Sequence, residues 1–420
     1  MNMMPIQTAA HFAMSPSSRR ESTVQFTREL LMEVDPITSA TTNETVFRIF
    51  KEQEHLASLP VVEDGRPIGL INRHIFMESL ARPFHREIYL RKSCIAFMDK
   101  QPLVVEDRLS IEELSFRVLA DSSKVLADGF IIVRDGVYRG LGLAQDMLGA
   151  VAHLQAEKNR LVMESIDYGS IIQQSLSRAS REGMREHLAD HFLIWEPRDV
   201  VSGDFYYFQH FGDGFLAVLF DCTGHGVPGT FMTLIMSAFL QGAINAESCR
   251  NPGALIAEIN RKVKIAMGQL DQSQDAAAEG HSDDGMDAAF CWFDAKTRRL
   301  TYAGAHMPLM LVLPETEGIT VIDGDRHGVG YATTAMEQTW ENHEIVLPAG
   351  TGVYLFTDGI FDQLGGDKRI AFGKRRVRTC LTENHRRPMP EQRQALLAAL
   401  AEYQGDEPRK DDVSALGFRV

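Results

Sequence analysis

The apolar run FLAVLF at 215–220 is followed directly by DCTGHGVPGTF at 221–231. Such a run is typical of a buried strand, and a carboxylate at its end is costly to remove from water. Asp221 therefore needs either an exposed turn or a positive partner such as a metal ion. The fold of this chain has to provide one of these two environments.

The chain has 420 residues, enough for two or three domains, with 44% hydrophobic and 24% charged residues. Its formal net charge of -14 argues against general binding to nucleic acid or to an anionic membrane. The basic cluster at 374–378 is compatible with an acidic partner, although a solvated helix face is the simpler explanation. The cysteines are scattered, and neither a signal peptide nor an apolar run of about 18 residues occurs. These features predict a cytoplasmic protein without a membrane span, with a disordered tail at 1–30.

Residues 31–150 repeat the order of a strand, a helix, a hairpin and a second helix. The segment LPVVEDGRPIGLINR leads into the helix HIFMESL, and GFIIVRDGVYRGLGLA later leads into the helix QDMLGAV. One such unit cannot easily bury its apolar face alone, so we expect the two copies to pack against each other. This α/β pair resembles a tandem CBS module, most clearly over LPVVEDGRPIGLINRHIF.

The CBS resemblance implies a nucleotide-binding position. Where such repeats bind adenine nucleotides, an Asp at the start of the last helix commonly holds the ribose. The second copy has Asp146 there, and the first copy has His74. A purely structural or dimerising pair is the alternative.

Residues 151–185 form the predicted helical linker. From just before it, apolar residues recur at spacings of three and four as an imperfect heptad seam, formed by Met147, Val151, Leu154, Leu161, Tyr168 and Ile172. This pattern predicts a signalling helix that pairs across a homodimer. The alternative is an amphipathic helix packed on its own domain.

Residues 186–420 alternate short apolar strands with two long helical stretches, which predicts an α+β layered domain. Four aspartates in this region share one position: each lies where an apolar strand meets a glycine or polar turn. They are Asp204, Asp221, Asp358 and Asp411. Alone, each is most simply a turn former or helix cap. Together they favour a site for two Mg²⁺ or Mn²⁺ ions, which prefer hard oxygen ligands and can activate a water for hydrolysis.

The region from about 162 to 420 resembles the SpoIIE-like branch of the PPM metal-dependent serine/threonine phosphatases. The matching segments are IDYGSIIQQSL, VSGDFYYF, DCTGHGVPGTFM, DDGMDAAFCWFD, YAGAHMPLML, GDRHGVG, LFTDGIFDQLGG and DDVSALGFRV. The resemblance implies an α-β-β-α sandwich, with a metal centre of two ions at one edge. It also implies that Asp221 bridges the ions, that the backbone carbonyl of Cys222 is a ligand, and that Asp204, Asp358 and Asp411 complete the set.

Three further residues have less certain roles. Asp287, beside the acidic insert at about 268–285 that we expect to be a mobile loop, could support a third metal or the substrate, or be a solvated loop carboxylate. His225 is expected to orient its loop and His306 to bond a backbone group. Neither is assigned as a general acid, and no arginine is evident for the phosphate.

The resemblance implies hydrolysis of phosphoserine or phosphothreonine on a protein. The expected substrate is a phosphorylated STAS-domain anti-anti-sigma protein in a partner-switching pathway, opposed by a kinase, with control by the CBS-like module. One alternative is a non-catalytic, nucleotide-sensing dimer that binds this regulator without dephosphorylating it. Another is a metal-dependent phosphodiesterase or small-molecule phosphatase, although it leaves the ordered motif set unexplained.

Overall fold

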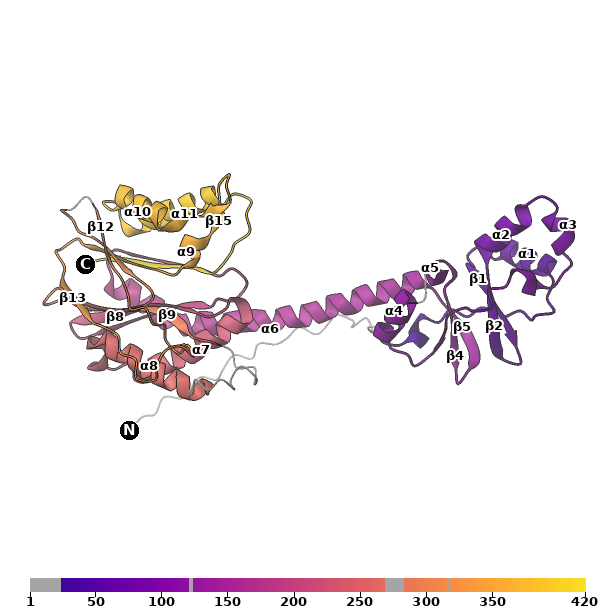
Figure 1. Cartoon of the computed structure of the whole chain (residues 1–420), viewed down its shortest axis with the longest axis horizontal. Coiled ribbons are helices and arrows are strands. Elements are labelled where there is room, and N and C mark those ends of the chain that lie inside the picture. Colours follow the sequence, from indigo (N-terminus) through magenta and orange to yellow (C-terminus); the bar gives the residue numbers. More distant parts are fainter. Residues whose placement is uncertain (1–23, 121–123, 269–282, 316–317) are drawn as a thin grey trace, which may run out of the picture. The chain divides into compact units, whose positions relative to one another are not determined.

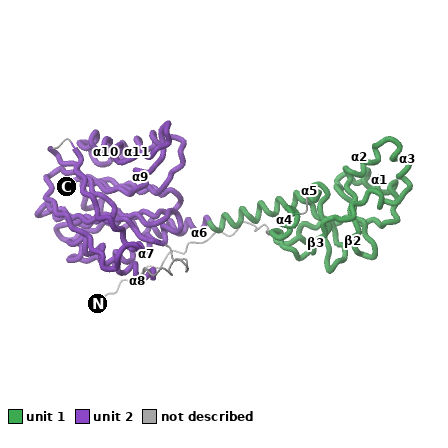
Figure 2. The backbone as a smooth tube through the Cα atoms, in the orientation of Figure 1, with its two compact units in different colours: residues 1–162 green, residues 163–420 purple. Residues whose placement is uncertain are grey.

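The computed structural model describes residues 24–120, 124–268, 283–315 and 318–420 (Figure 1). The chain forms two compact units, residues 1–162 and 163–420 (Figure 2). Most of the acidic insert expected to be a mobile loop lies outside the described residues. Within the described residues, no helix has the length and apolar character that crossing a bilayer requires.

The first unit contains the two predicted copies. The first copy consists of α1 (Asn43–Glu52), β1 (Ser58–Glu63), β2 (Arg66–Asn72) and α2 (Arg73–Ala81), followed by the short α3 (His85–Tyr89). The second copy consists of β3 (Val104–Glu106), α4 (Ile111–Ala120), α5 (Lys124–Asp128), β4 (Phe130–Arg134) and β5 (Val137–Gly142). One hydrophobic cluster joins Val61 and Leu70 of the first copy to Ile131 and Leu141 of the second. The two copies therefore bury their apolar faces against each other, as their repeated pattern predicts.

Residues 24–30 differ from the sequence prediction, which placed them in a disordered tail. Thr27–Leu30 form a 3₁₀ helix, and the Thr27 side chain is fully buried. The Thr27 amide and hydroxyl both donate to the carbonyl of Leu109, each at 2.9 Å. Val24 and Leu30 pack against the core of the second copy, which supplies the apolar burial that holds this segment.

The linker helix α6 spans Ala144–His187 and is longer than the predicted 151–185. Its first part does not follow the dimer prediction, because Met147 is buried and Val151 and Leu154 pack on the core of the second copy. Further along, Tyr168 and Ile171 are exposed at 65% and 60% of their surface. Gln173, near the end of the helix, is buried against the second unit.

The second unit is built on two five-stranded antiparallel sheets. The first has the order β13-β10-β9-β8-β7, and the second has the order β12-β11-β14-β17-β6. The strands are β6 (His191–Glu196), β7 (Asp204–Phe211), β8 (Gly214–Cys222), β9 (Met286–Asp294), β10 (Arg299–Ala305), β11 (Leu309–Val312), β12 (Ile319–Ile322), β13 (His343–Val346), β14 (Gly352–Phe356) and β17 (Val413–Arg419). A small hairpin adds β15 (Leu364–Gly365) and β16 (Ile370–Ala371).

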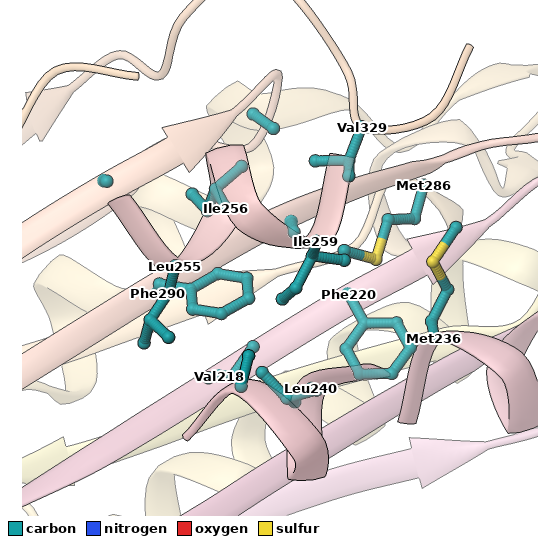
Figure 3. Packing of buried hydrophobic residues seen from close by; sticks show 14 of the residues in the cluster. Val218, Phe220, Met236, Leu240, Leu255, Ile256, Ile259, Met286, Phe290 and Val329 are labelled. Carbon is teal, nitrogen blue, oxygen red and sulfur yellow. The ribbon is translucent and has the colours of Figure 1, made fainter. Parts of the chain in front are cut away.

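Two pairs of helices cover the outer faces of this sandwich (Figure 1). The helices α7 (Gly226–Ala243) and α8 (Pro252–Met267) pack on the first sheet, where Phe220 and Met236 lie in one core (Figure 3). The helices α10 (Gly373–Asn384) and α11 (Met389–Gln404) pack on the second sheet. A third core fills the space between the sheets. The predicted α-β-β-α sandwich is confirmed.

Candidate metal centre

Three aspartates form a row across the end of the first sheet. Asp204 of β7 lies opposite Asp221 of β8, and Asp221 lies opposite Asp287 of β9. Residues directly opposite each other in antiparallel strands project from the same face of the sheet. The three carboxylates therefore share the face that is turned towards the second sheet.

The second sheet brings two more aspartates to this edge. Asp358 follows β14 and heads the short helix α9 (Gly359–Asp362), but its side chain makes no capping hydrogen bond. Asp411 lies just before β17, the strand that pairs with β14. The Thr357 hydroxyl donates to Oδ2 of Asp204 at 2.8 Å and so ties the two sheets together at this point.

The glycine-rich loop after Asp221 packs tightly against the segment before Asp204. A Cβ added to Gly203 would lie 2.4 Å from the carbonyl oxygen of Gly224, and one added to Gly229 would lie 2.1 Å from the same atom. Gly224 also has a φ of +84°, which side-chain-bearing residues rarely adopt. Close backbone approach explains these glycines. The Cys222 side chain is buried in the core of the first sheet, and burial raises the pKa of its thiol.

Asp412 differs from its neighbour Asp411 because its carboxylate binds backbone amides and so positions the chain. Its two carboxylate oxygens accept hydrogen bonds from the amides of Arg198 and Gly203, each at 2.6 Å. The Asp412 side chain is 3% exposed. It therefore fastens the start of β17 to the segment before Asp204.

Asp287 is held by two side chains. Its Oδ1 lies 2.8 Å from Nδ1 of His306 and accepts a hydrogen bond from the Tyr331 hydroxyl at 3.3 Å. Nε2 of His306 lies 2.8 Å from the carbonyl oxygen of Arg326, so this nitrogen donates. Burial lowers the pKa of His306, but the hydrogen bond and charge of Asp287 outweigh it and raise the pKa. The expected backbone bond of His306 is confirmed.

The structure also places an arginine that sequence reasoning missed. The guanidinium of Arg198 donates to the carbonyl oxygen of Lys410 at 3.1 Å, directly before Asp411, and to Nε2 of His225 at 2.6 Å. Nδ1 of His225 then donates to Asp199 at 3.1 Å. The contact with Lys410 joins residues 212 positions apart, so no local pattern could have indicated it.

The electrostatics of the carboxylates fit divalent cations. Burial raises the pKa of Asp204 to about 7, and burial together with the charges of Asp204, Asp358 and Asp411 raises that of Asp221 well above its usual value. Within the described residues, none of these four carboxylates forms an ion pair with a basic side chain. Hard oxygen donors that lack a protein cation suit Mg²⁺ or Mn²⁺.

The donor atoms are not gathered round a single point. Among the parts of the chain that the structure describes, no group of three or more His, Cys, Asp or Glu side chains has the geometry of a metal site. Binding a cation therefore requires these side chains to turn towards it. The residues present fit divalent metals by their chemistry and their position in the fold.

Comparisons with known proteins point to one family for the second unit. The sequence model of the Stage II sporulation protein E (SpoIIE) family matches residues 212–420, and that of the CBS domain matches residues 28–82. The solved SiaA-PP2C domain of Pseudomonas aeruginosa is 35% identical, with a TM-score of 0.55, and the match covers 63% of this chain and 99% of that one. The comparison with curated proteins finds no match.

Two solved structures of lower identity also match. The RsbU and RsbW domains of a Mycobacterium tuberculosis protein are 16% identical, with a TM-score of 0.44, over 55% of this chain and 60% of that chain. The PP2C phosphatase domain of SpoIIE from Bacillus subtilis, with a fragment of its regulatory domain, is 15% identical, with a TM-score of 0.42, over 55% and 61%.

Proposed function

Because the chain belongs to the SpoIIE family of PP2C-type serine/threonine phosphatases, we propose that it hydrolyses phosphoserine or phosphothreonine on a protein regulator. The observation that carries the proposal is the convergence of five aspartates from both sheets on one edge of the sandwich. The family resemblance implies a phosphorylated STAS-domain protein as the substrate and a kinase that opposes the reaction.

Asp221 is the proposed bridging ligand, because it lies in the middle of the row between Asp204 and Asp287. Asp204, Asp358, Asp411 and the backbone carbonyl of Cys222 are the proposed remaining ligands. Two Mg²⁺ or Mn²⁺ ions held there would supply the Lewis acidity that activates water and neutralises charge on the phosphoryl oxygens.

Arg198 is the proposed phosphate-binding residue. It is exposed, and its guanidinium is fixed beside Asp411 by the Lys410 carbonyl. A guanidinium matches the geometry of a phosphate group, so it would orient the substrate and stabilise negative charge on its oxygens. Asp287, held by His306 and Tyr331, is proposed to support a third ion or the substrate.

The deciding experiment is phosphate release from a phosphoserine STAS-domain protein, with and without Mn²⁺. We expect Asp221→Ala to lower the rate by at least about a hundredfold, since it removes a carboxylate that the cations and the transition state need. The matched control is Asp213→Ala, at the opposite end of the same strand pair, where the side chain is exposed and pairs with Lys296. Release that needs neither metal nor Asp221 would overturn the proposal.

We also propose that the first unit controls the phosphatase as part of a homodimer. Gln173 of α6 donates to the carbonyl of Ser202 at 2.7 Å and to the Thr233 hydroxyl of α7 at 3.1 Å. Ser202 lies two residues before Asp204, so a shift of α6 would be transmitted to the acidic edge. The exposed apolar residues Tyr168 and Ile171 support pairing of α6 with a second copy.

An adenine nucleotide is the proposed ligand of the first unit. Asp146 lies exposed in the first turn of α6, at the position that the CBS resemblance implies for a ribose contact. Calorimetric titration of the full chain with AMP, ADP and ATP, beside Asp146→Ala, tests this. Absence of heat, or equal binding by the variant, would contradict it.

A further inference from the structure

The second unit contains a cavity of about 340 Å³ along the outer edges of β6 and β7. These two strands end the orders of their respective sheets, so the cavity lies where the sandwich edge meets the last turns of α6 and the first turn of α11. None of the five aspartates lines it. Its walls include Arg181, Arg185, His191, Trp195, Tyr206 and Arg393.

The cavity carries positive charge that the protein does not neutralise. Within the described residues, none of its three arginines forms an ion pair with a carboxylate. Arg181 donates to the backbone carbonyl of Gln174 at 3.1 Å, and Arg393 donates to that of Leu193 at 3.0 Å. Asp190 is next to His191 in sequence, but its carboxylate already accepts a hydrogen bond from the Arg419 side chain.

A buried hydroxyl in the cavity wall also lacks a partner. The Tyr206 side chain is fully buried, and its hydroxyl has no hydrogen bond within the described part of the chain. Arg181 and Arg185 line the same cavity as Tyr206. An unsatisfied buried donor costs stability, and an acceptor oxygen supplied by a ligand would remove that cost.

We propose that this cavity binds a phosphate-type oxyanion of a small molecule through Arg181, Arg185 and the Tyr206 hydroxyl. Arginines suit a group with several acceptor oxygens, and hydrogen bonds between charged partners are the strongest of their kind. The anion is either inorganic phosphate or the phosphate of a mononucleotide. The site does not rest on the proposed activity of the metal centre.

The position of the cavity couples the bound anion to the acidic edge. The Trp195 indole N–H donates to the backbone carbonyl of Asp204 at 2.9 Å. The same indole packs edge-on against the Tyr206 ring, with centroids 5.6 Å apart. Tyr206 is also two residues from Asp204 on β7, so an anion that fixes Tyr206 and Trp195 also fixes the strand that carries Asp204.

Calorimetry with inorganic phosphate tests the site on the full chain, stripped of metal ions and then freed of chelator. We expect Arg185→Gln to weaken phosphate binding in the cavity at least about tenfold, because a charge-assisted contact is lost. Arg378→Gln, which removes an exposed arginine of α10 outside the cavity, is the matched control and should bind as the native chain does.

Tyr206→Phe provides a second variant whose folding is not in doubt. It removes a hydroxyl that has no partner, so it should weaken phosphate binding without lowering the melting temperature. A parallel titration of Asp146→Ala with AMP identifies the source of the phosphate. Binding that is tighter than that of inorganic phosphate and is weakened by Arg185→Gln indicates a nucleotide, and equal binding indicates free phosphate. No binding of either probe, or equal weakening by Arg185→Gln and Arg378→Gln, would overturn the proposal.

Discussion

At the scale of single residues, we expect Thr357 to affect how well the acidic edge holds a cation. Its hydroxyl orients the buried carboxylate of Asp204, and Thr357 is itself fully buried. Groups that orient metal ligands typically contribute about 10- to 100-fold to metal affinity. We therefore expect Thr357→Val to require about 10- to 100-fold more Mn²⁺ for half-maximal phosphate release.

The matched variant for this prediction is Thr357→Ser, which keeps the hydroxyl and should keep the native Mn²⁺ requirement. Excess Mn²⁺ should restore most of the activity of Thr357→Val, because the ligands themselves are intact. A Thr357→Val protein with the native Mn²⁺ curve would show that this hydrogen bond does not orient a metal ligand.

Asp204 gives the metal-free protein a specific dependence on pH. Burial raises its pKa from 3.8 to about 7 in the folded state. Between these two values the folded protein keeps a proton that the unfolded chain releases, so this contribution to stability is lost as the pH rises through the window. We expect the melting temperature of the metal-free protein to fall between about pH 4 and pH 7.

Asp204→Asn should flatten this pH dependence, because its amide does not titrate. Mn²⁺ should restore stability most strongly at the alkaline end, where a cation replaces the lost proton. Calorimetric melting curves of both proteins measure the effect, and equal slopes for the native chain and Asp204→Asn would contradict it.

The sequence reveals the aspartates of the site more readily than the residues that hold them. Asp221 and Asp358 stand at the ends of apolar runs, which is a local signal that needs no knowledge of the fold. Asp412 and Thr357 act through contacts 209 and 153 positions away in the chain. No periodicity encodes such distances, so these roles require the three-dimensional structure.

At the scale of elements, α6 shows why the heptad seam was only partly informative. An apolar residue at a helical spacing packs equally well on its own domain or on a second copy. Met147 packs on its own domain, in the core of the second CBS-like repeat, whereas Tyr168 remains exposed. The seam predicted the helix correctly, but its boundaries and partners depend on the flanking units.

A dimer formed through the middle of α6 makes a prediction at this scale. Tyr168→Glu places a charge on the exposed apolar face and should convert a dimer of the full chain into a monomer, measured by light scattering. Gln174→Glu adds the same charge at an exposed polar position and should leave the dimer intact. A native chain that is monomeric at micromolar concentration would contradict the proposed dimer.

At the scale of the whole molecule, the two units have separate cores. Among the residues that the structure describes, the second unit contains three hydrophobic clusters of its own, and the first contains two. Deleting residues 1–150 should therefore leave a folded phosphatase that still needs Mn²⁺. We expect its rate of phosphate release or its oligomeric state to change, because Gln173 links α6 to the segment before Asp204.

The measurement is phosphate release and molecular mass for the truncated and full chains side by side. A truncated protein that matches the full chain in both would show that the first unit does not regulate the second. An unfolded truncated protein would show that the first unit is required for folding, which its separate core argues against.

The row of Asp204, Asp221 and Asp287 also disfavours shifted pairing of the strands that carry it. Side chains alternate between the two faces of a strand, so sliding β8 by one residue against β7 would turn Asp221 towards α7. There it would meet the apolar core formed by Phe220 and Met236 on the helix side, without a cation or a hydrogen-bond donor. The residues proposed to perform chemistry thus penalise misaligned versions of the same sheet before any substrate arrives.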